Sequence, residues 1–181
     1  MTPPSSLCVF CGSSSGRDPR HAAAARELGA LVAVRGLTLV YGGARVGLMG
    51  EVANAALAAG GRVVGVLPTV LVEREVEHDG LSELHRVATM HERKARMAEL
   101  SGAFAALPGG IGTLEELFEV ATWAYLQIHA KRFGLLNVAG YYDGLLAFLD
   151  RAVADRFLKP ETRAQFIVAE EPARLLDLLT G

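Results

Sequence analysis

Apolar residues along the chain fall into short continuous runs that alternate with longer stretches of helical periodicity. The short runs predict strands at 7–13, 37–43, 62–68, 84–89, 103–110, 132–138 and 165–171. The longer stretches predict helices at 18–36, 47–61, 91–102, 113–128, 142–158 and 173–179. The polar stretch 73–83 is predicted to be a loop or a short helix. Because the strands are apolar throughout, helices are expected to cover both faces of their sheet.

This alternation predicts an α/β fold with a doubly wound parallel sheet of about seven strands flanked by helices. Residues 1–181 match the size of a single domain and contain no linker, repeat or low-complexity tract. Ligands of such folds bind at the carboxyl ends of the strands. Glycines follow three of the predicted strands there, namely Gly12, the pair Gly42 and Gly43, and the pair Gly109 and Gly110.

Composition and charge exclude several classes of protein. Hydrophobic residues make up 51 per cent of the chain, which is too many for a disordered protein. The formal net charge of −2 gives no general attraction to nucleic acid or to an acidic membrane. No apolar run reaches the roughly 18 residues of a membrane span, and the N-terminus lacks the features of a signal peptide. We therefore expect a cytoplasmic protein with no nucleic-acid or membrane partner.

The two cysteines, Cys8 and Cys11, form a C-x-x-C pattern. This spacing occurs in redox pairs, whose first thiol normally meets a helix N-terminus. Here Cys8 lies inside a predicted strand, and helix signals begin only after Asp18. The pattern therefore favours two small buried residues over a redox site. The five histidines show no metal-binding spacing, so no metal is predicted.

The segment PGGIGT, residues 108–113, joins a predicted strand to a predicted helix. Glycines let backbone N–H groups approach a ligand, and a helix start adds free donors and a positive dipole end. This combination is typical of an anion site, most often for phosphate. The alternative is a tight strand-to-helix turn without a ligand. Neither the P-loop pattern nor G-x-G-x-x-G is present, which argues against a dinucleotide or a Walker-bound ATP.

Two glutamates, Glu115 and Glu116, follow this turn. Thr113 and Glu116 have the spacing of a capping box, and negative charge is favoured in a first helical turn, so a structural role explains both carboxylates. A role in binding or catalysis remains the alternative, because the glycine-rich turn directly before them is suited to binding an anion.

A basic cluster, Arg93, Lys94 and Arg96, opens the helix after the fourth predicted strand. Cations at a helix start oppose the helix dipole, so helix stabilisation does not explain them. If the fourth and fifth strands pair, the cluster lies near Gly109 and Gly110. Binding of an anionic substrate and a solvated surface are both compatible with the pattern.

Several stretches together resemble the LONELY GUY (LOG) family of cytokinin riboside 5′-monophosphate phosphoribohydrolases, long mislabelled as lysine decarboxylases. The family motif P-G-G-x-G-T-x-x-E matches 108–116, and the M-x-x-R-K element matches 90–94. The resemblance runs from about Leu7 to Leu179. It implies a Rossmann-like fold, a homodimer and a nucleoside 5′-monophosphate substrate such as AMP or N6-prenylated AMP. The N-glycosidic bond would be cleaved to free base and ribose 5-phosphate, and no cofactor is expected.

The resemblance also implies roles for individual residues. Arg93 and Glu116 take the catalytic places. Substrate and phosphate contacts are implied for Glu75, Lys94, Gly109, Gly110, Ile111, Gly112, Thr113, Leu114, Glu115 and Thr122, with Gly12, Ser13, Gly42 and Gly43 at the mouth of the site. By analogy with glycosidases, Glu116 would stabilise positive charge on the ribose and orient water, and Arg93 would keep it ionised. Glu75 is a candidate for protonating the leaving base.

The chain departs from the family pattern after Trp123, where Tyr125, Gln127 and Arg132 replace a glutamine, a glycine and a proline. These changes bear on the base pocket or on a dimer contact through the helix at 118–126. Three other functions remain as alternatives: a non-catalytic nucleotide carrier, a pyridoxal-phosphate decarboxylase and a structural dimer module. No lysine stands in a convincing Schiff-base setting, which counts against the decarboxylase.

Overall fold

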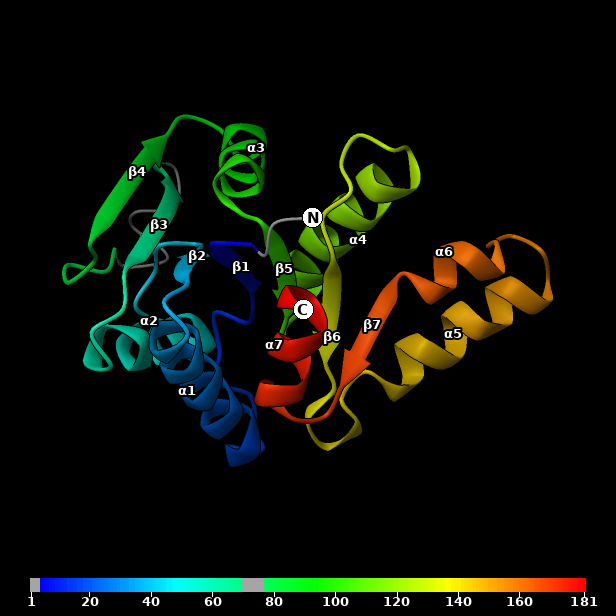
Figure 1. Ribbon diagram of the computed structural model, residues 1–181, viewed down its shortest axis with the longest axis horizontal. Coiled ribbons are helices and arrows are strands. Elements are labelled where there is room, and N and C mark those ends of the chain that lie inside the picture. The colour runs from blue at the N-terminus through cyan, green and yellow to red at the C-terminus, as the bar shows by residue number, and fades with distance from the viewer. Residues whose placement is uncertain (1–3, 70–76) are drawn as a thin grey trace.

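The computed structural model describes residues 4–69 and 77–181. Its centre is a parallel sheet of seven strands in the order β4-β3-β2-β1-β5-β6-β7 (Figure 1). The strands are β1 (Ser6–Phe10), β2 (Thr38–Tyr41), β3 (Val63–Pro68), β4 (Glu83–Val87), β5 (Ala103–Ala106), β6 (Phe133–Leu136) and β7 (Phe166–Ala169). The predicted doubly wound parallel sheet is therefore confirmed.

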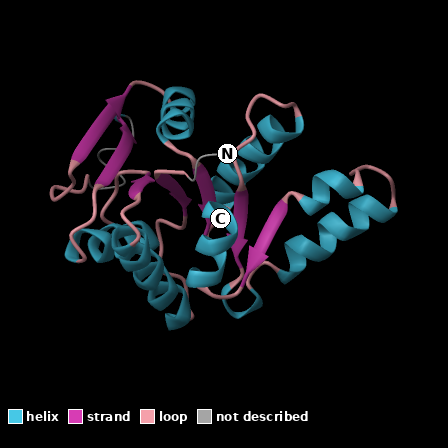
Figure 2. Cartoon of the chain, in the orientation of Figure 1, coloured by secondary structure: helices cyan, strands magenta, loops and turns pink. Residues whose placement is uncertain are grey.

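Helices cover both faces of this sheet (Figures 1 and 2). The α-helices are α1 (Pro19–Val34), α2 (Gly47–Ala58), α3 (Met90–Leu100), α4 (Ile111–Tyr125), α5 (Asp143–Ala154), α6 (Pro160–Ala164) and α7 (Pro172–Thr180). A short 3₁₀ helix, η2 (Val138–Gly140), precedes α5. No helix in the described ranges has both the length and the apolar character that crossing a bilayer requires.

Apart from the edge strand β4, the strands contribute side chains to two hydrophobic cores, one on each face of the sheet. In β1, Leu7 and Val9 pack with residues of α1, α2 and α7, whereas Cys8 and Phe10 pack with residues of α3, α4 and α5. All five residues of β1 are buried, which explains the unbroken apolar runs in the sequence. Cys8 and Cys11 are both free and buried, so the interpretation of the C-x-x-C pattern as buried small residues is confirmed.

The C-terminal third differs in detail from the prediction. The helix predicted at 142–158 ends earlier, as α5, and a separate short helix, α6, follows it. Pro160 stands at the first position of α6, where its fixed φ and missing N–H are tolerated. No helix was predicted from the sequence at this proline. The predicted loop at 73–83 falls partly outside the described residues.

The strand order corrects one expectation about the site. β4 lies at the edge of the sheet and pairs with β3, so β4 and β5 are not neighbours. Instead, α3 crosses back over the sheet, in contact with β3, β2 and β1, to reach β5. The chain builds the sheet outward in one direction from β1 to β4 and in the other direction from β5 to β7. The direction changes between β1 and β5, which pair with each other. The carboxyl ends of these two strands form the switch point at which such folds bind ligands.

Candidate functional site

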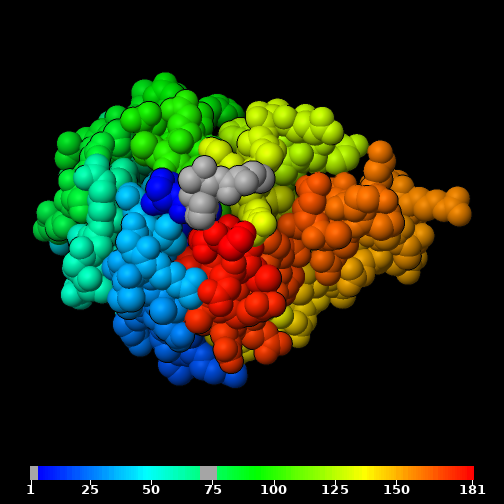
Figure 3. All heavy atoms as spheres, viewed as in Figure 1, coloured from blue at the N-terminus to red at the C-terminus, as the bar shows by residue number. Residues whose placement is uncertain are grey.

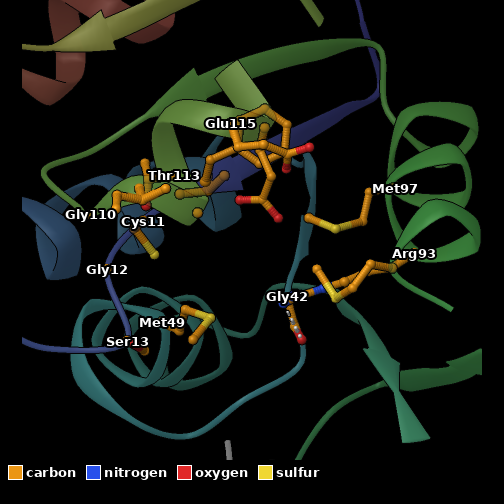
Figure 4. A pocket seen from close by; sticks show the side chains of 16 residues that line it. Cys11, Gly12, Ser13, Gly42, Met49, Arg93, Met97, Gly110, Thr113 and Glu115 are labelled. Atoms are coloured by element: carbon orange, nitrogen blue, oxygen red, sulfur yellow. Dashed lines mark hydrogen bonds between the residues drawn. The ribbon is translucent and has the colours of Figure 1, made fainter. Parts of the chain in front are cut away.

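A cavity of about 290 Å³ opens at this switch point, between α3 and α4 (Figure 4). Its floor is formed by the ends of β1 and β2 and the loops that follow them. The lining residues are Val9, Phe10, Cys11, Gly12, Ser13, Gly42, Met49, Met90, Arg93, Met97, Gly110, Ile111, Gly112, Thr113, Glu115 and Glu116. The cavity thus brings together the glycine-rich turn, the two glutamates and one arginine of the basic cluster.

Helix α4 begins at the glycine-rich turn without a side-chain cap. Gly110 is the N-cap in an extended conformation (φ −93°, ψ −153°), and Ile111 is the first helical residue. The first hydrogen bond within the helix runs from Leu114 N to Gly110 O. The N–H groups of 111–113 therefore have no acceptor within the helix. These donors, together with the positive end of the helix dipole, favour an anion on the cavity wall.

The predicted capping box is wrong. Thr113 is the third residue of α4 and is buried, rather than being the residue that precedes the helix. Glu115 and Glu116 consequently lie beyond the first turn, which contains no acidic residue. The reason is that Gly110 accepts the extended cap conformation, so the helix starts three residues earlier than a cap at Thr113 would place it. Helix capping therefore does not account for Glu116.

The glycine turn is held by a close approach between two loops. Gly12 N donates to Pro108 O at 3.1 Å, which links the loop after β1 to the loop after β5. A Cβ on Gly109 would lie 2.1 Å from Thr113 Oγ1 and 2.9 Å from Gly12 N. Only glycine fits there without moving the start of α4.

We expect Gly109→Ala to lower kcat/KM for a substrate with an anionic group by at least about tenfold, because a displaced turn misplaces the bound group. Gly144→Ala is the matched control, since a Cβ on Gly144 in α5 meets nothing within 4 Å. Steady-state kinetics of the two variants give the measurement. Wild-type kinetics in Gly109→Ala would contradict the role given to the turn.

Arg93 is buried although it is charged. Its residue exposure is 5 %, and its guanidinium donates from Nε to Val66 O and from Nη2 to Gly42 O, each at 3.1 Å. The side chain thereby ties the first turn of α3 to the ends of β2 and β3 and forms part of the cavity wall (Figure 4). A Cβ on Gly42 would lie 2.1 Å from Arg93 Nη2, which explains this glycine.

The other two members of the basic cluster do not line the cavity. Lys94 forms ion pairs with Glu115 and Glu119 of α4. Arg96 pairs with Glu99 on the surface of α3, at 3.2 Å between Arg96 Nη1 and Glu99 Oε2. The solvated-surface interpretation is therefore right for Arg96 and wrong for Arg93.

The negative charge of Glu116 affects the neighbouring Cys11 thiol, which also lines the cavity. Burial raises the pKa of the Cys11 thiol well above its usual range, and the negative charge of Glu116 raises it further. Arg93 acts in the opposite direction on the same thiol. Cys11 is therefore a neutral thiol at physiological pH and not a nucleophile. Arg93, Glu115 and Glu116 are therefore the charged groups that line the cavity.

The structure places the predicted site residues in three groups. Those that line the cavity are Gly12, Ser13, Gly42, Arg93, Gly110, Ile111, Gly112, Thr113, Glu115 and Glu116. Those that do not line it are Gly43, Lys94, Gly109, Leu114 and Thr122. Glu75 lies outside the described residues. Thr122 donates to Phe118 O and lines a different hollow, beside Tyr125 and Phe157.

Sequence reasoning missed the sulfur-containing wall of the cavity. Met90 and Met97 flank Arg93 on one face of α3, and Met49 of α2 lies near Gly42. The spacing of 90, 93 and 97 is the helical i, i+3, i+7 pattern, which could have revealed this face. Flexible thioether side chains suit a flat apolar ligand group such as a base.

A second hollow of about 500 Å³ lies behind the glycine turn and shares Gly12, Ser13 and Gly110 with the cavity. At its wall, Tyr141 Oη donates to Gly109 O at 2.5 Å. The ring of His21 meets that of Tyr141 edge-on, with 5.5 Å between ring centroids. These contacts brace the turn from the side opposite the cavity.

Among known structures, the fold matches proteins of low sequence identity. The molybdenum cofactor binding protein of Rippkaea orientalis is 22 % identical with a TM-score of 0.72, and the match covers 98 % of this chain and 95 % of that one. The molybdenum cofactor carrier protein of Chlamydomonas reinhardtii is 23 % identical with a TM-score of 0.71, covering 98 % and 96 %. These likenesses establish the fold alone.

Sequence comparison is more specific. The family model described as "Possible lysine decarboxylase" matches residues 49–179. A probable cytokinin riboside 5′-monophosphate phosphoribohydrolase of Oryza sativa, LOGL9, is 55 % identical over 96 % of this chain and 76 % of its own length. The corresponding Arabidopsis thaliana enzyme LOG5 is 51 % identical over 96 % and 76 %, and that of Rhodococcoides fascians is 51 % identical over 93 % and 85 %. The chain therefore belongs to the LONELY GUY family of cytokinin riboside 5′-monophosphate phosphoribohydrolases.

Proposed function

We propose that the protein hydrolyses the N-glycosidic bond of adenosine 5′-monophosphates, including N6-modified ones, to free base and ribose 5-phosphate. One observation carries the proposal: the uncapped start of α4 and the carboxylate of Glu116 share one wall of a cavity that Arg93 also lines. An anion site and a carboxylate about one helical turn apart match the two ends of a ribose 5-phosphate unit. The names of the relatives agree with this chemistry.

The phosphate binds at the first turn of α4, where the N–H groups of 111–113 are its donors. Ser13, on the loop after β1, also lines the cavity. Holding the phosphate fixes the ribose, and a fixed geometry can supply several kcal/mol of the rate enhancement. The base then lies toward Met49, Met90 and Met97.

Cleavage of the bond between C1′ and the base nitrogen builds positive charge on the ribose. The negatively charged Glu116 carboxylate stabilises this positive charge, and it also orients the water that attacks C1′. Because the charge is largest in the transition state, the carboxylate stabilises that state more than the bound substrate. Water supplies the hydroxyl group of the ribose 5-phosphate product, and a proton is transferred to the departing base.

Arg93 gives the cavity a fixed positive group. Its two hydrogen bonds to strand-end carbonyls leave the planar guanidinium without freedom to rotate away. The guanidinium balances Glu116 and offers charge-assisted hydrogen bonds to substrate oxygens.

A product assay tests this proposal. Wild-type protein is incubated with AMP, GMP, CMP, UMP and N6-prenylated AMP, and free bases and ribose 5-phosphate are quantified by chromatography. The proposal expects equimolar base and ribose 5-phosphate from the adenosine monophosphates. Tight nucleotide binding without any released base would contradict it and support a carrier function.

We further propose a homodimer in the cytoplasm. Large apolar side chains are exposed near the end of α4 and on α5, including Tyr125, Leu126 and Phe148, of which Phe148 is 65 % exposed. The segment between α5 and α6 projects from the molecule (Figure 3), and Phe157 there is 90 % exposed. Tyr125 and Phe157 line one shared hollow, and exposed apolar side chains that lie together favour contact with a second copy. Light scattering of the purified protein distinguishes a dimer from a monomer.

A further inference from the structure

One lysine connects the two helices that enclose the cavity. Lys94 of α3 lies between two carboxylates of α4, which are one turn apart on the same face of that helix. Lys94 Nζ is 3.0 Å from Glu119 Oε1 and is also paired with Glu115. The Lys94 side chain is only 9 % exposed, that of Glu119 is 24 % exposed, and that of Glu115 is 50 % exposed. The pair with Glu119 is thus the better shielded of the two.

The lysine and its partners adjoin the residues that face the substrate. Lys94 follows Arg93 directly in α3, and Glu115 precedes Glu116 directly in α4. The cavity lies between these helix faces. A sliding or tilting of α3 relative to α4 therefore changes the distance across the cavity between Arg93 and Glu116. The ion pairs of Lys94 oppose that movement.

The geometry points to Glu119 as a positioning residue that acts through Lys94 to hold α3 and α4 at the separation the reaction requires. This inference rests on the proposed function, and it assigns Glu119 a role that no motif in the sequence indicated. It also changes the role of Lys94, for which the family resemblance implied a substrate contact. The Lys94 ammonium already has two carboxylate partners, and Lys94 does not line the cavity.

The first test is Glu119→Gln, which keeps the shape of the side chain and removes its charge. We expect kcat to fall about tenfold, because reacting groups are misplaced, whereas KM changes little since no substrate contact is lost. Glu99→Gln is the matched control: it breaks the exposed pair with Arg96 on the other side of α3 and is expected to leave both constants unchanged. A melting temperature lowered without any change in kcat would overturn the inference.

A double-mutant cycle tests whether Glu119 acts through Lys94. Kinetics are measured for Lys94→Met, Glu119→Gln and the double variant. If Glu119 acts only through the lysine, the double variant is no slower than Lys94→Met, and the two effects are not additive. Lys94→Arg, which retains a cation able to reach both carboxylates, is expected to be faster than Lys94→Met. Additive losses, or a loss in Lys94→Met confined to KM, would show that the lysine contacts substrate instead.

Hydrogen–deuterium exchange separates this inference from the proposed function. Without substrate, amides of 90–100 in α3 are expected to exchange faster in Glu119→Gln than in the wild type or in Glu99→Gln, because the helix is less firmly held. Equal exchange in all three proteins would overturn the positioning role. A wild-type protein that releases no base would overturn the proposed function, and the exchange measurement would still decide whether Glu119 holds the helices.

Discussion

Glu116→Gln is expected to abolish release of free base from AMP while the protein remains folded and still binds the nucleotide. Glutamine matches glutamate in size, so the cavity keeps its shape. Its neutral amide, however, cannot stabilise a developing positive charge as a carboxylate does. Removing an electrostatic group of this kind typically lowers kcat by about 10²–10³. Single-turnover kinetics with AMP measure the effect, and circular dichroism and equilibrium binding establish that folding and binding are retained.

Glu115→Gln is the matched control for this variant. Glu115 is the neighbouring residue and also lines the cavity, but its carboxylate is paired with Lys94 and half exposed. Its loss is expected to reduce kcat far less than the loss of Glu116. Equal effects of the two substitutions, or turnover close to wild type in Glu116→Gln, would remove Glu116 from the mechanism.

Arg93→Ala is expected to lower kcat/KM by about 10² or more, because a preorganised charge facing the substrate is lost. It also leaves Val66 O and Gly42 O without this donor, and a buried acceptor left unsatisfied costs about 1–3 kcal/mol of folding free energy. Kinetics and chemical denaturation measure the two effects separately.

Arg93→Lys tests whether charge alone is sufficient. A lysine retains the cation but lacks the planar fork that donates to two carbonyls in fixed directions. We therefore expect activity to remain far below that of the wild type. A fall in stability with unchanged turnover in either variant would confine Arg93 to a structural role.

Much of the fold follows from local pattern. The continuous apolar runs predicted strands that are covered on both faces, and Leu7 and Cys8 pack into opposite cores as that pattern requires. The strand order was less accessible, because the pairing of β1 with β5 depends on long-range contacts. The assumption that β4 neighbours β5 was natural from chain order and proved wrong.

The site shows the same division. The glycine motif predicted a tight turn that leads into a helix start, since backbone geometry at Gly109 and Gly110 is a local property. The separate roles of Arg93 and Lys94 could not be predicted, because adjacent residues of a helix point in different directions and their partners are distant in sequence. The capping box failed for a related reason: the sequence spacing fitted, but a glycine took the cap position first.

The central claim is that the start of α4 binds the phosphate of a nucleotide while Glu116 lies at the bond that breaks. A crystal structure of the Glu116→Gln variant with AMP tests it most directly, since the substrate should persist without hydrolysis. The account predicts phosphate oxygens within hydrogen-bond distance of the N–H groups of 111–113, with C1′ facing residue 116. A nucleotide bound elsewhere, with this helix start unoccupied, would contradict it.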